Sequence, residues 1–181
     1  MTSRSITKIS TRDMCLIALF TAILAVMAQI SVPMPFGVPF TMQTFAVPLA
    51  AVVLGAKKGT AVTIVYILLG AVGVPVFTGF GGGFSRIIGP WGGFILSYPI
   101  FAFIVGYCAD KGKKPTLAIG LAVGSLINLT MGMAQFGFVN GISIREAFLA
   151  AFAPFVLMEA VKMAMVFLCG FRIRNSVLKP R

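Results

Sequence analysis

The sequence contains no histidine and only four acidic residues among its 181 positions. Histidine is the commonest general base near neutral pH and the commonest metal ligand. Its absence excludes a Ser-His-Asp triad, a Cys-His dyad and an HExxH zinc site. The three cysteines, Cys15, Cys108 and Cys169, lie apart in apolar segments and lack the CxxC spacing of a metal or redox site. We therefore expect no metal, no cofactor and no enzymatic activity.

Charge of either sign is scarce as well. Charged residues make up 10% of the chain, hydrophobic residues make up 59%, and the mean hydropathy is +1.01. A soluble domain of this size needs far more polar surface. In a bilayer, only helix bundles and closed barrels satisfy every backbone polar group, and the apolar runs here are continuous, as in helices. The composition predicts an all-α integral membrane protein with a single domain spanning residues 1–181.

The positive charges indicate how the chain crosses the membrane. Most of the 15 basic residues fall into four clusters: Arg4, Lys8 and Arg12; Lys57 and Lys58; Lys111, Lys113 and Lys114; and Arg172, Arg174, Lys179 and Arg181. Each intervening apolar stretch is long enough for two crossings, and basic loops stay in the cytoplasm. Both termini are therefore expected in the cytoplasm, with an even number of spans, most simply six. Anionic headgroups then balance the net charge of +11, and nucleic acid is not needed to explain it.

Two irregular segments interrupt the expected helices, which span residues 13–30, 42–54, 59–74, 91–109, 115–136 and 145–169. Residues 31–41 hold three prolines, which disfavour a helix and predict extended backbone that dips into the protein. Residues 75–90 hold five glycines and two prolines, which predict a tightly bent loop. The second and third helices are short for a hydrocarbon layer of ~30 Å, which needs ~20 residues. Short helices followed by irregular outer loops predict a cavity that opens outward.

Three charged residues are not explained by topology. Glu159 and Lys162 share one face near the middle of the last expected helix, where an ionisable group costs at least ~2.5 kcal/mol. They either neutralise each other to specify packing or bind a polar ligand in the cavity. We favour ligand binding, because apolar residues can serve packing alone. Arg86, within the glycine-rich loop, is either an interfacial anchor or a bidentate clamp for a carboxylate arriving from outside.

Further candidates are polar or aromatic. Gln43 and Asn128 carry amides that either bond between helices or bind a ligand with its own amide-like group. Tyr66, Phe80 and Trp91 belong to the core, to the interfacial belt or to the wall of a pocket.

A pair of small residues marks the first helix. Ala18 and Ala22 are four residues apart and therefore allow another helix to approach closely. Packing within the chain is the default interpretation of such a pair.

Four blocks of sequence resemble the BioY family, the biotin-binding S components of energy-coupling-factor (ECF) transporters. The blocks are VPFTMQT at 38–44, LGAKKG at 54–59, YILLGAVGVPVF at 66–77 and GPWGGF at 89–94. The resemblance implies a six-helix fold with an outward-facing site. It also implies a transmembrane coupling subunit and two cytoplasmic ATPases as partners, which drive the S component to topple in the membrane. The chain has no Walker A motif of its own.

The resemblance also assigns residues by position. It implies that Gln43 and residues 79–90 border the biotin site, that the family's acidic-x-x-Lys pair falls on Glu159 and Lys162, and that the coupling subunit meets Ala18 and Ala22. The family usually has an aspartate in place of Glu159 and a threonine in place of Trp91.

We therefore expect a biotin-capturing subunit in a prokaryotic plasma membrane. Arg86 is favoured as the partner of the biotin carboxylate, and Glu159 and Lys162 either meet the ureido group or steady one another. The alternatives are an S component for a biotin precursor or another small carboxylate vitamin, and a proton-coupled secondary carrier.

Overall fold

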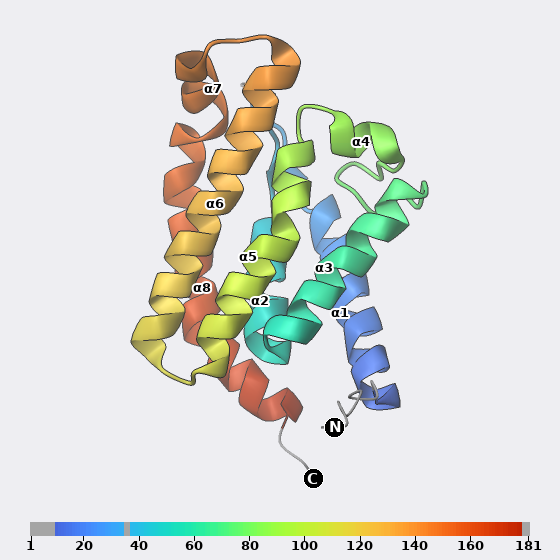
Figure 1. Cartoon of the computed structure of the whole chain (residues 1–181), viewed down its shortest axis with the longest axis vertical. Coiled ribbons are helices and arrows are strands. Elements are labelled where there is room, and N and C mark those ends of the chain that lie inside the picture. The colour runs from blue at the N-terminus through green and yellow to red at the C-terminus, as the bar shows by residue number, and fades with distance from the viewer. Residues whose placement is uncertain (1–9, 35–36, 179–181) are drawn as a thin grey trace, which may run out of the picture.

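A computed structural model describes residues 10–34 and 37–178 of the chain as a helix bundle. Within these residues, six helices have twelve residues or more: α1 (Thr11–Gln29), α2 (Gln43–Leu54), α3 (Ala56–Ala71), α5 (Gly92–Asp110), α6 (Lys114–Asn140) and α8 (Ala153–Leu178). Two shorter helices, α4 (Phe84–Ile88) and α7 (Ile144–Ala151), lie at the same end of the bundle, on opposite sides of it (Figure 1). The predicted all-α fold is confirmed.

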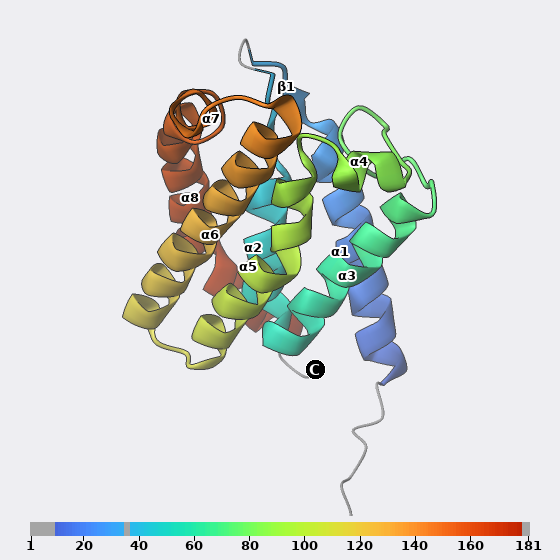
Figure 2. The same cartoon turned by 45° about the horizontal axis from the view of Figure 1, so that its top comes forward.

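The end that carries α4 and α7 is called the loop end below. It also holds an antiparallel hairpin of β1 (Ser31–Val32) and β2 (Phe40–Thr41) (Figure 2). Val38, between these strands, is buried, as expected of a segment that dips into the protein. The hairpin is short because prolines between its strands cannot donate to a ladder.

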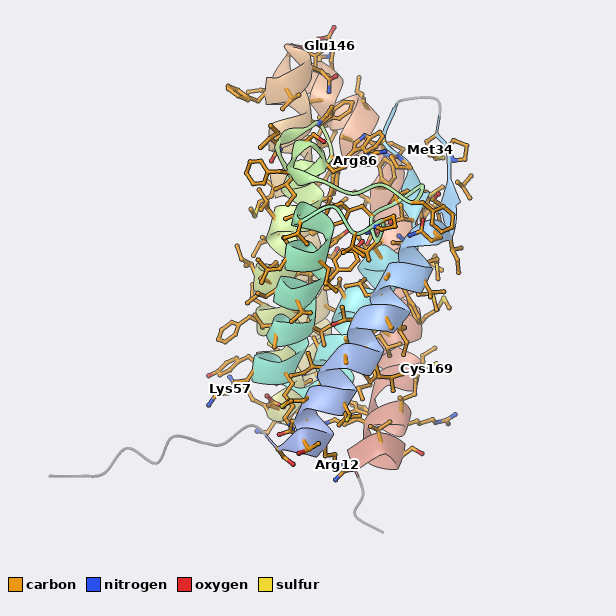
Figure 3. All side chains as sticks on the ribbon, turned by 90° about the vertical axis from the view of Figure 1, so that its right-hand side faces the viewer. Arg12, Met34, Lys57, Arg86, Glu146 and Cys169 are labelled. Carbon is orange, nitrogen blue, oxygen red and sulfur yellow. The ribbon has the colours of Figure 1, made fainter. Side chains whose placement is uncertain are left out.

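The opposite end of the bundle collects the basic residues and is called the basic end. The start of α1, the α2–α3 junction, the α5–α6 loop and the end of α8 all lie there (Figure 1). Arg12 and Lys57 mark this end in Figure 3, whereas Arg86 and Glu146 lie toward the loop end. The predicted gathering of the basic loops is therefore observed, and the basic end is expected in the cytoplasm. The sequence-based assignments of Arg4, Lys8, Pro35, Lys179 and Arg181 fall outside the described residues.

Two carboxylates at the basic end are paired. Asp13 forms an ion pair with Lys58 of α3. Asp110, at the end of α5, pairs with Arg174 of α8 at 2.7 Å and accepts the backbone N–H of Ala56 at 3.0 Å. These contacts tie α1 to α3 and join α3, α5 and α8, so the basic end is fixed by side chains as well as by loops.

The outer surface of the bundle is apolar. Among the described residues, four stretches are long and apolar enough to cross a membrane, namely α1, α5, α6 and the region 144–177, which holds α7 and most of α8. Large apolar side chains such as Leu19, Phe103 and Leu168 are exposed along them. Such a surface is stable only in lipid, and the protein is an integral membrane protein.

Helix α2 forms the centre of the bundle, with ten of its 12 residues buried. Small side chains let its neighbours approach: a Cβ atom on Gly59 of α3 would lie only 2.6 Å from Ala51 Cα. Close backbone packing of this kind holds membrane helices together, because lipid supplies no hydrophobic force between them.

Several predicted boundaries were wrong, and each has a local cause. The expected loop at 75–90 contains α4. The expected last helix, 145–169, is divided at Phe152 into α7 and α8, and α8 continues to Leu178. A capping box begins α7: Ser143 Oγ accepts from Glu146 N at 3.3 Å, and Glu146 Oε2 accepts from Ser143 N at 2.8 Å.

Candidate functional site

A cavity lies inside the bundle near the loop end, between the hairpin, the 72–91 segment and helices α2, α5, α6 and α8. Its polar lining consists of Thr41, Gln43, Thr44, Thr78, Arg86, Asn128, Glu159 and Lys162, and its aromatic lining of Phe77, Trp91, Phe94, Tyr98 and Phe155. Six of the eight residues predicted to bind substrate are therefore brought together: Gln43, Arg86, Trp91, Asn128, Glu159 and Lys162. Apolar walls with a few convergent polar groups are typical of a small-molecule site.

Glu159 and Lys162 form a buried ion pair at the inner wall of this cavity. Both residues are 3% exposed, and Lys162 Nζ lies 2.7 Å from Glu159 Oε1. The ammonium also donates to Thr44 Oγ1 at 2.6 Å and to Thr41 O at 2.9 Å. Thr44 in turn donates its hydroxyl to Glu159 Oε1 at 2.6 Å. An ammonium has three N–H donors, so Lys162 is fully used in holding Glu159, β2 and α2 in place.

Two acceptor oxygens in the cavity wall lack a donor. Among the described residues, Glu159 Oε2 and Asn128 Oδ1 are buried side-chain oxygens without a hydrogen-bond partner. The amide nitrogen of Asn128 is committed, since it donates to Ser97 Oγ at 2.6 Å and to Phe94 O at 3.1 Å. A buried acceptor without a donor costs ~1–3 kcal/mol. The cavity therefore favours a ligand that presents N–H or O–H donors to these two oxygens.

Gln43 has its amide committed to the protein. Its Nε2 donates to Tyr66 Oη at 2.5 Å. Its Oε1 accepts the hydroxyls of Thr41 at 3.1 Å, Thr78 at 3.2 Å and Tyr98 at 3.2 Å. Gln43 thus joins α2 to α3, α5 and the glycine-rich segment, and it shapes the cavity floor.

Tyr66 and Phe80 do not line the cavity. Tyr66 is fully buried behind Gln43 and packs edge-on against Phe77, with ring centroids 5.4 Å apart. Phe80 is 73% exposed on the surface of the glycine-rich segment, and its backbone N–H donates to Gln29 Oε1 at 2.8 Å. Tyr66 therefore supports the site from behind, while the Phe80 side chain points away from it.

Arg86 and Trp91 lie at the outer limit of the cavity, since both also line a second, outer hollow with Met34 and Gly37 of the hairpin segment. The Arg86 guanidinium carbon lies 5.3 Å from the centroid of the Trp91 ring. Trp91 Nε1 donates to Gly37 O at 2.9 Å. In the part of the chain that the structure describes, no carboxylate lies within 4.0 Å of Arg86. A half-buried, unpaired guanidinium at this position suits an incoming carboxylate.

The Ala18 and Ala22 pair lies on an exposed face of α1, together with Cys15 and Leu19. The default interpretation, that this pair packs within the chain, is therefore wrong. The face is open to another helix.

Sequence patterns did not single out Thr44 or Tyr98. Threonine and tyrosine are common in membrane helices, and neither carries a charge that would mark it as exceptional. The available signal was position: Thr44 follows Gln43 in the first turn of α2, and the buried lysine needs a second polar partner nearby.

Comparisons with known proteins identify the family of this chain. The model of the BioY family matches residues 1–179. The probable biotin transporter BioY of Pyrococcus horikoshii is 39% identical over 165 residues, covering 91% of this chain and 98% of that protein. The biotin transporter BioY of Thermotoga maritima is 37% identical, covering 91% and 96%.

A solved structure shares the fold. The crystal structure of the S component for biotin from an ECF-type ABC transporter superposes with a TM-score of 0.84, at 22% identity and covering 91% of each chain. The protein therefore has the fold of an ECF S component. The family match over nearly the whole chain, together with relatives above 30% identity, shows that this chain belongs to the BioY family.

Proposed function

We propose that this protein captures biotin from outside the cell as the S component of an ECF transporter in the plasma membrane. One observation carries the proposal: the cavity pairs two donor-less oxygens, on Glu159 and Asn128, with an unpaired guanidinium, on Arg86, at its outer limit. The names of the relatives support the same ligand.

The chemistry of biotin matches each part of the cavity. Its ureido ring carries two N–H donors, which fit Glu159 Oε2 and Asn128 Oδ1. Its sulphur-containing ring is apolar and suits the aromatic walls formed by Phe94 and Phe155. Its carboxylate tail then extends outward to Arg86. Lys162 acts indirectly, because its three donors already fix Glu159 and α2.

The position of Trp91 leaves the selection of the head group to other residues. Trp91 lies beside Arg86 at the outer limit of the cavity, so its indole faces the tail of the ligand. The oxygens that select the ureido head belong to α6 and α8, and the tryptophan at position 91 does not change them. Relatives of biotin that keep the ureido head are therefore the expected competitors.

Uptake then depends on partners. We propose that the single domain of residues 1–181 lies with its basic end in the cytoplasm and that the Ala18–Ala22 face of α1 docks on a transmembrane coupling subunit. Two ATPases of the same module supply the energy, and the S component topples to release biotin inside.

A competition experiment tests the ligand. Labelled biotin is bound to the purified protein and displaced by desthiobiotin, lipoate or pantothenate. All three competitors carry a carboxylate, and desthiobiotin alone keeps the ureido group. We expect displacement by desthiobiotin and none by lipoate or pantothenate at equal concentration. Displacement by lipoate or pantothenate, or an absence of biotin binding, would contradict the proposal.

A further inference from the structure

A groove follows the lipid-facing side of the bundle between α6 and α8, separate from the substrate cavity. The two helices lie beside each other (Figures 1 and 2), and the small side chains on their facing surfaces leave the space between them unfilled. This α6–α8 groove is edged by Ala118, Ala122, Leu126, Ala160, Ala164 and Leu168. Buried Leu121 and Met163 form its floor. Ser125 is the single polar side chain in its lining, so the groove suits hydrocarbon.

The length of the groove matches one leaflet of a bilayer. On α6 the lining runs from Ala118 to Leu129, which is ~16 Å at the usual rise per residue. On α8 it runs from Val156 to Leu168, which is ~18 Å. Half of a hydrocarbon layer is ~15 Å, and a helix that crosses both leaflets needs ~20 residues of contact. The groove is therefore long enough for an acyl chain and too short for a docked transmembrane helix.

The groove begins at the basic end, where cations flank it. Lys114 is one helical turn before Ala118, and Arg172 is one turn after Leu168, so each lies on the groove face of its helix. Both side chains are exposed. Across residues 10–34 and 37–178, no carboxylate lies within 4.0 Å of either cation. Unpaired cations at one end of an apolar groove complement a phosphate joined to an acyl chain.

We propose that the α6–α8 groove binds one acyl chain of an anionic phospholipid, with the phosphate held between Lys114 and Arg172. The bound lipid belongs to the leaflet at the basic end. Its chain reaches Leu129, which also lines the substrate cavity. The lipid therefore packs against the back of the wall that faces the vitamin.

The headgroup preference is tested by native mass spectrometry. The purified protein is equilibrated with equal amounts of phosphatidylglycerol and phosphatidylcholine that carry identical acyl chains, and the lipids retained on the protein are counted. We expect phosphatidylglycerol to exceed phosphatidylcholine at least tenfold. In Lys114→Gln/Arg172→Gln the ratio should fall close to one. The matched control, Lys57→Gln/Lys111→Gln, removes two exposed charges at the same end and should keep the preference.

The acyl site is tested by filling the groove. Ala160→Phe places a ring between α6 and α8, whereas Val161→Phe places the same ring on the neighbouring, lipid-facing position outside the groove. We expect retained lipid to fall at least tenfold in Ala160→Phe and to stay unchanged in Val161→Phe.

Two lipid measurements would overturn the proposal: equal retention of both lipids by the unaltered protein, or full lipid retention by Ala160→Phe. A dimer that Ala160→Phe abolishes would also overturn it, because a second copy of the chain would then occupy the groove. If Ala160→Phe fails to fold, the ratio of phosphatidylglycerol to phosphatidylcholine retained by Lys114→Gln/Arg172→Gln still tests the proposal, because both substituted side chains are exposed.

Discussion

At the scale of single residues, the ion pair between Glu159 and Lys162 is proposed to serve both packing and ligand recognition. The two carboxylate oxygens of Glu159 differ in their contacts: Oε1 is bonded to the protein, and Oε2 is left without a donor. Lys162 also lies 4.0 Å from the centroid of the Phe40 ring. The cation therefore holds the carboxylate, the hairpin and α2 together while one oxygen stays available to a ligand.

Removal of Lys162 should be more harmful than removal of both charges. Lys162→Met leaves Glu159 buried without its cation, which costs ~3–5 kcal/mol, and the apparent melting temperature in detergent should fall. Adding Glu159→Gln should restore much of the loss, because no charge then remains unpaired.

Biotin binding by the same pair of variants separates packing from recognition. We expect both to lose biotin binding in calorimetry. If the double variant binds biotin as tightly as the unaltered protein, the pair has a packing role alone.

Arg86 should contribute to ligand affinity and little to stability. Arg86→Ala removes the proposed partner of the carboxylate, and we expect a loss of at least ~2 kcal/mol, about thirtyfold in Kd. Arg145→Ala is the matched control, since it removes an exposed arginine from α7 at the same end. Calorimetry with biotin measures both variants, and equal affinities would remove Arg86 from the site.

At the scale of elements, the helices could be predicted because apolar runs and turn residues mark them. The predicted second helix, 42–54, agrees with α2 within one residue. The division of the last expected helix at Phe152 was missed, although Pro154 marks it. A proline inside a helix lacks the backbone N–H donor and disfavours helical backbone just before it. Helix α4 was missed since five residues between glycines carry too short a pattern to indicate a helix.

The exposed face of α1 leads to a prediction about assembly. Ala18→Leu/Ala22→Leu fills the surface that a partner helix would approach, so co-purification with a coupling subunit should fall severalfold while biotin affinity stays unchanged. Ala134→Leu, at an exposed alanine of α6, is the control. Undiminished co-purification of the double variant would place the partner on another face.

At the scale of the whole molecule, the sequence predicted where the basic residues lie more completely than it predicted which residues line the cavity. The basic clusters mark the two termini and every second connection, and these must share one end when helices alternate in direction. The aromatic residues gave no such rule: Tyr66 lies behind the cavity and Phe80 on the surface, although both belong to the same stretch of sequence. Which layer an aromatic ring occupies depends on packing between distant helices.

The orientation in the membrane can be measured directly. In a variant without its native cysteines, Ser143→Cys at the loop end should react with an impermeant maleimide added outside intact cells. Lys113→Cys at the basic end should react only after the membrane is opened. The reverse pattern would invert the proposed topology.

The bond between Trp91 and Gly37 is too weak to limit the rate of the proposed capture. It is a neutral N–H···O bond, worth ~0.5–1.5 kcal/mol, which is about one to three times thermal energy. Such a bond breaks and re-forms far more often than a scarce nutrient arrives by diffusion. For the proposed function, release of this contact is therefore not the slow step of association, and the rate of biotin capture should follow the outside concentration.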